Sequence, residues 1–113
     1  MKQLKPTLRE KNRYVAFELS SDRKCVRDDV VKAVWSTTLR FLGESRASEM
    51  SLWIMDWEDA TQRGILKVNH KSIKDLRCGL SMLASVGGAP ASVRVLSVSG
   101  TLKSVRERHF KKT

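Results

Sequence analysis

Residues 14–20 read YVAFELS, and this stretch sets the fold of the chain. Its apolar side chains recur at every second position, a period typical of a β-strand with one face in a core. Val15, Phe17 and Leu19 are therefore expected to enter the core, while the residues between them face away. We expect a half-buried strand near the start of the domain.

The pattern downstream of this strand predicts five further elements and a terminal segment. They are a helix over 28–43, strands over 51–57 and 65–70, a helix over 72–86, a strand over 91–100, and a short basic helix within 101–113. Gly43 is expected to end the first helix. Ser72 is the candidate cap of the second helix, and Gly87, Gly88 and Pro90 are expected to end it. The order predicts an α+β, ferredoxin-like or RRM-like βαββαβ sandwich, in which two helices cover one face of a four-stranded antiparallel sheet. Residues 1–113 are expected to form this single domain.

The charge of the chain is concentrated at its two ends. The formal net charge is +10, and residues 1–14 and 101–113 each carry five cations against one glutamate, a net +4 each. A basic N-terminal arm (1–13) and a basic C-terminal segment around a nearly neutral middle favour a binding surface for a polyanion. The candidate RNA-binding residues are Lys5, Arg9, Lys11, Arg13, Lys103, Arg106, Arg108, Lys111 and Lys112.

The two cysteines and the absence of long apolar runs indicate a cytoplasmic protein. Cys25 and Cys78 belong to no CxxC motif, no apolar signal core opens the sequence, and no apolar run is long enough to span a membrane. We expect two reduced thiols and no membrane partner.

The sequence shows no pattern of catalytic or metal-binding residues. His70 and His109 lie far apart in the sequence, and no glycine-rich phosphate loop precedes a helix. Asp56, Glu58 and Asp59 crowd the turn between two predicted strands, and we interpret them as a solvated turn rather than a Mg²⁺ site. We therefore predict no catalytic residue, no metal ligand and no cofactor bound by this chain.

The predicted strand 51–57 carries two tryptophans. Trp53, Met55 and Trp57 are expected to share one face, and we favour a place in the core over stacking on RNA bases. A protein interface is the other interpretation, because exposed aromatic residues mark contact sites. The interface candidates are Trp53, Trp57 and the nearby acids Asp56, Glu58 and Asp59, which suit a basic protein partner.

Two stretches together resemble a known family. KPTLREKNRYVAFEL (5–19) and VLSVSGTLKSVRERHF (95–110) are similar to the opening and closing signatures of ribonuclease P protein component 2, the small archaeal subunit related to a protein of eukaryotic ribonuclease P and MRP. AVWSTTLRFLGE (33–44), WIMDWEDATQRGILKVNH (53–70) and LRCGLSML (76–83) agree in outline. The sequence departs from the family pattern in a short loop before the first helix and a clipped C-terminus.

The resemblance implies a role in a ribonucleoprotein endonuclease. Members of this family support a catalytic RNA that removes the 5′ leader from precursor tRNA, and that RNA, not the protein, carries the active site and uses Mg²⁺. It also implies a larger barrel-like protein subunit as partner, a homodimer within a heterotetramer, and only indirect contact with the precursor tRNA.

Three other functions stay open on the sequence. The distribution of charge fits a generic, ribosomal-type RNA-binding protein equally well. A small-molecule regulatory module on the same fold would leave the basic ends without a role. A stand-alone nuclease would have to use the acids of the hairpin turn.

Overall fold

The computed structural model describes residues 11–110. Its elements are β1 (Asn12–Ser21), α1 (Arg27–Glu49), β2 (Trp53–Glu58), β3 (Arg63–Asn69), the 3₁₀ turn η2 (His70–Ser72), α2 (Ile73–Ser81), β4 (Ser85–Val86), β5 (Ala89–Ser99) and α3 (Leu102–His109). Within residues 11–110, no helix combines the length and the apolar character that crossing a membrane requires.

The sheet has five antiparallel strands in the order β2-β3-β1-β5-β4, so the expectation of four strands is wrong. Strand β4 forms because α2 ends at Ser81 and leaves Ser85–Val86 free to pair with the start of β5. Gly87 and Gly88 both have positive φ, as a tight two-residue hairpin turn requires. The Gly-Gly pair is therefore a hairpin turn beyond the end of the helix. Without β4, the strand order is compatible with a ferredoxin-like sandwich.

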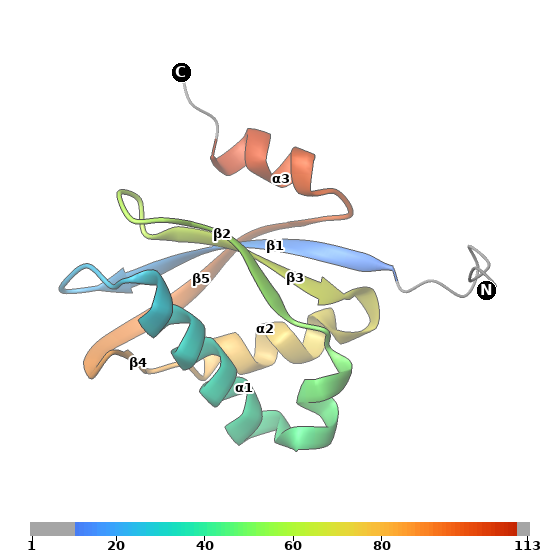
Figure 1. Ribbon diagram of the computed structural model, residues 1–113, viewed down its shortest axis with the longest axis horizontal. Coiled ribbons are helices and arrows are strands. Elements are labelled where there is room, and N and C mark those ends of the chain that lie inside the picture. The colour runs from blue at the N-terminus through green and yellow to red at the C-terminus, as the bar shows by residue number, and fades with distance from the viewer. Residues whose placement is uncertain (1–10, 111–113) are drawn as a thin grey trace.

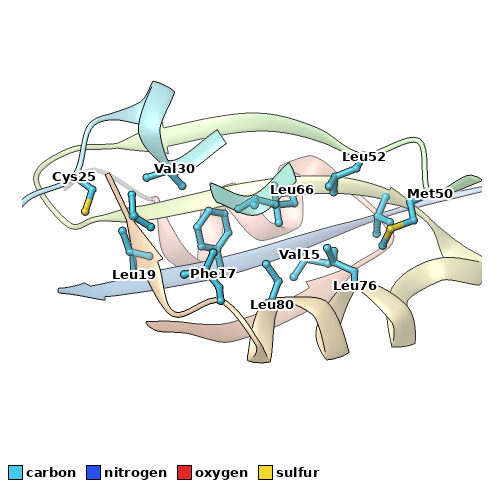
Figure 2. Packing of buried hydrophobic residues seen from close by; sticks show 14 residues of the cluster. Val15, Phe17, Leu19, Cys25, Val30, Met50, Leu52, Leu66, Leu76 and Leu80 are labelled. Atoms are coloured by element: carbon cyan, nitrogen blue, oxygen red, sulfur yellow. The ribbon is translucent and has the colours of Figure 1, made fainter. Parts of the chain in front are cut away.

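Helices cover both faces of the sheet (Figure 1). Helices α1 and α2 pack on one face, as expected, and α3 lies across the other. Val15, Phe17 and Leu19 of β1 are buried in the main core beneath α1 and α2 (Figure 2), which confirms the predicted alternation. Ala16 is fully buried as well, because α3 closes the opposite face.

Helix α1 continues past Gly43, where the sequence predicts its end. Gly43 has φ 85° and ψ 162°, so the helix is interrupted there and resumes as a second stretch up to Glu49. Glycine reaches this conformation without the steric cost that a side chain imposes. The second stretch places Ala47 and Met50 in the interior, and the Met50 backbone carbonyl accepts a 2.8 Å hydrogen bond from the Asn69 N–H.

Candidate nucleic-acid interface

The start of β1 and the connection from β5 to α3 lie side by side at one end of the sheet. Strands β1 and β5 are antiparallel neighbours, and Tyr14 lies opposite Ser99, so the chain enters β1 beside the point where it leaves β5. The Arg13 guanidinium lies against Gly100, in the connection to α3. A Cβ atom added to Gly100 would be 3.8 Å from Arg13 Nη1. The same nitrogen donates a 3.0 Å hydrogen bond to the backbone oxygen of Asn12. Arg13 is thus held against the strand ends.

Strand β3 and the turn after it bring two further cations to this place. The His70 backbone N–H donates to the Lys11 carbonyl oxygen at 2.8 Å, and His70 Nδ1 lies 3.1 Å from the same oxygen. Lys71 follows directly in η2, and Lys67 lies opposite Tyr14 in the register of β3 with β1. The sequence prediction missed both lysines, because only the pairing of distant strands brings them to the N-terminal arm.

We call this cluster of cations the basic end. It consists of Lys11, Arg13, Lys67, Lys71 and Lys103, the last being in the first turn of α3. None of the five forms an ion pair with another residue in the range 11–110. Their charge therefore remains available to an external anion.

Helix α3 is fixed to the sheet by one buried side chain and two polar contacts. Val105 is 1% exposed and packs with Ala16 and Ile65 in a second, smaller core. Arg106 donates to both carboxylate oxygens of Asp56 in β2, at 2.7 and 3.0 Å. The hydrogen bonds and the charge of Asp56 raise the pKa of Arg106 above its ordinary value. Arg106, a predicted RNA ligand, is therefore occupied by an internal ion pair.

The C-terminal half of α3 also carries Arg108 and His109. His109 Nε2 lies 2.8 Å from Ser97 Oγ in β5. Burial, followed by the charges of Arg63 and Arg108, lowers the pKa of His109 below its ordinary value. Of the other predicted RNA ligands, Arg108 and Lys103 are exposed, and Lys5, Arg9, Lys111 and Lys112 lie outside the described residues.

The acids of the β2–β3 hairpin are engaged within the chain. Asp56 pairs with Arg106, Glu58 Oε1 accepts a 2.6 Å hydrogen bond from the Thr61 hydroxyl, and Asp59 Oδ1 accepts a 2.7 Å bond from Trp57 Nε1. In the part of the chain that the structure describes, no three His, Cys, Asp or Glu side chains are grouped to hold a metal ion.

The two tryptophans of β2 lie on opposite faces, so the expectation that they share one is wrong. The register of β2 with β3 shifts between Ile54 and Asp56, which places Trp57 opposite Gly64 and Trp53 opposite Lys67. Such a bulge adds one residue to one strand and reverses the alternation beyond it. Trp57 packs on the core, with its ring centroid 6.0 Å from that of Phe17, whereas Trp53 is 64% exposed. The predicted place in the core is correct for Trp57 and wrong for Trp53.

The centre of the outer sheet face is closed to RNA. Val105 of α3 covers Ala16 and Ile65, and Tyr14 of β1 packs against the same cluster. An RRM binds bases on this central surface. Any RNA contact of this domain therefore uses the ends and edges of the sheet.

The fold and the basic end define a small α+β protein with a surface suited to a polyanion. The family model of the Rpp14/Pop5 family matches residues 13–110. The chain belongs to the Rpp14/Pop5 family, which confirms the family that the sequence resembles.

Individual relatives agree with this assignment. The chain is 37% identical over 107 residues to "Ribonuclease P protein component 2" of Thermococcus kodakarensis, covering 95% of this chain and 89% of the relative. It is 38% identical over 108 residues to the protein of the same name from Methanosarcina mazei, covering 96% and 91%. A chain in the cryo-EM structure of yeast ribonuclease MRP superposes with a TM-score of 0.69 at 18% identity, covering 94% and 95%, and supports the fold.

Proposed function

We propose that this chain is a non-catalytic protein subunit of ribonuclease P that supports the catalytic RNA in removing the 5′ leader from precursor tRNA. Membership of the Rpp14/Pop5 family and the name shared by its relatives support this role. The observation that carries it is the basic end, where segments far apart in the sequence gather five cations that form no ion pair within residues 11–110.

The proposed mechanism is neutralisation of RNA phosphates. Lysine and arginine side chains displace condensed counterions from a polyanion, and this makes binding depend steeply on salt. Arg13 and Lys67 lie on strands and Lys103 lies on a docked helix, so the backbone positions that carry these charges are fixed. A preorganised cationic surface allows negatively charged RNA segments to approach one another at lower Mg²⁺ concentrations. The RNA supplies the active site and its Mg²⁺ in this proposal.

The distribution of charge also suggests where a protein partner contacts the chain. The hairpin acids Glu58 and Asp59 lie at the opposite end of β3 from Lys67 and Lys71. This end repels RNA and suits a basic surface on a larger, barrel-like ribonuclease P subunit. A heterotetramer built on a homodimer of this chain, and a cytoplasmic location that suits the free thiols Cys25 and Cys78, belong to the same proposal.

Reconstitution tests the proposed function. Cleavage of precursor tRNA by ribonuclease P RNA at limiting Mg²⁺ is measured with the partner subunit, in the presence and absence of this chain. We expect the chain to increase the cleavage rate and to lower the Mg²⁺ requirement. RNA binding without stimulation would instead indicate a generic RNA-binding protein, and would contradict the proposal.

A further inference from the structure

Trp53 is the most exposed large apolar side chain among the residues that the structure describes. Its exposed fraction is 64%, whereas Trp57, four residues along the same strand, packs on the core. The bulge at Met55 causes this difference, because it turns Trp53 to the other face of β2. An exposed indole in a folded protein commonly marks a contact site.

The surroundings of Trp53 are cationic. Trp53 lies opposite Lys67 in β3, and Lys67 lies opposite Tyr14 in β1. Side chains of directly opposed residues in antiparallel strands project from the same face at short distance. The Trp53 and Lys67 side chains therefore project from the same face of the sheet, the face on which α3 lies.

A shallow cavity borders Trp53 on its other side. It measures about 390 Å³ and is lined by Trp53, Arg27, Val31, Trp35, Leu52 and Ile54. Its wall is mostly apolar, with Arg27 as the single charged group, so it offers ring surfaces and one cation but few hydrogen-bonding partners. Such a lining suits a planar ring that is bound by stacking on its face rather than by hydrogen bonds to its edge.

We propose that Trp53 stacks on an unpaired base of the bound RNA, while Lys67 and the rest of the basic end bind the adjoining phosphates. Aromatic residues beside a cationic track are the combination that single-stranded nucleic acids require, and stacking on them tolerates any base. The inference rests on the proposed function, since it assumes that the basic end binds RNA.

The experiment compares variants of the full chain on two probes, a short single-stranded oligouridylate and an RNA duplex of equal length. Trp53→Ala should weaken binding of the single strand by about five-fold or more, and should leave duplex binding unchanged. Trp53→Phe keeps a stacking ring and should stay close to the wild type. Phe41→Ala removes an exposed aromatic side chain from α1, far along the sequence from the basic end, and is the matched control.

Intrinsic fluorescence supplies an independent readout. The oligouridylate should quench the emission of the wild-type protein, and this quenching should disappear in Trp53→Phe, which retains Trp35 and Trp57. RNA binding without such quenching, and with unchanged affinity of Trp53→Ala, would overturn the stacking proposal and leave the proposed function standing. Loss of partner-subunit binding in Trp53→Ala with intact RNA affinity would overturn it in favour of a protein contact. A wild-type chain that binds neither probe would refute the proposed function itself.

Discussion

Single residues in this protein show where sequence patterns suffice and where they fail. The alternation around Phe17 correctly predicts its burial, because each strand residue follows the same two-residue period. The same reasoning misplaces Trp53, because a bulge at Met55 adds one residue that no local pattern reveals. Gly64 is equally hidden in the sequence, although the packing of Phe17 against Trp57 depends on its missing side chain.

Gly64→Ala should destabilise the protein. A Cβ at this position would lie 2.7 Å from two ring carbons of Phe17 and 3.0 Å from the Asp56 carbonyl oxygen, so the fully buried ring must move. We expect a loss of about 1–3 kcal/mol in the free energy of unfolding, measured by urea denaturation. Gly79→Ala in α2 is the control, because its Cβ would meet Thr38 atoms only at 3.9 Å or more. It should be neutral or stabilising, and an equal loss in both variants would refute the steric explanation.

Glu18 should make stability depend on pH. The hydrogen bond from Arg94, followed by that from Arg63, lowers the pKa of the Glu18 carboxyl below its ordinary value. Because the folded-state pKa is depressed, the stabilisation is present above the unfolded-state pKa and is lost as the pH falls through the folded-state pKa. The difference in free energy of unfolding between wild type and Glu18→Gln should therefore be largest near neutral pH and should shrink in acid. Glu44→Gln, which removes a carboxylate without an ion pair to a described residue, should show no such trend in the same titration.

Among the elements, α3 is the one whose contacts are least predictable from its sequence. Its cations predict a basic helix, and this is confirmed, but its amphipathic pattern is too short to predict which surface it covers. The structure shows that Val105 fixes it over Ala16 and Ile65, and that the exposed Arg106 pairs with Asp56. Both contacts link residues forty or more positions apart, beyond the reach of any periodic pattern.

Val105→Ala should release α3 from the sheet. The side chain is 1% exposed, and its truncation leaves a small void between the helix and β1, at a cost of about 2 kcal/mol. We expect faster hydrogen exchange of the α3 amides, and little change in the amides of α2 on the other face. The control is Val26→Ala, the same chemical change at a side chain that is 57% exposed. Unchanged exchange in α3 would mean that other contacts hold the helix.

At the scale of the whole molecule, the arrangement of charge depends on the sheet topology. The order of elements predicts a sheet with two helices on one face, and the stretches 5–19 and 95–110 resemble the family to which the chain belongs. Neither predicts strand β4 or the place of α3 on the other face. The sequence does not show that Tyr14 pairs with both Ser99 and Lys67, which places Lys67 between the start of β1 and the end of β5. Nor does it show the hydrogen bond from His70 to Lys11, which brings Lys71 to the same place. Strand register is a long-range property, so this part of the site required the structure.

The most direct test of this convergence compares two triple variants with the same net charge. The first variant removes three of the five cations of the basic end, by Lys11→Ala, Arg13→Ala and Lys103→Ala. The second variant removes three exposed cations from α1 and α2 on the other face, by Lys32→Ala, Arg40→Ala and Arg77→Ala. The measurement is the slope of log K against log salt concentration for binding to ribonuclease P RNA. We predict that the first variant flattens the slope by about 2–3 units and that the second leaves it near the wild-type value. Equal slopes in the two variants would show that RNA senses only the total charge, and would contradict a binding surface at the basic end.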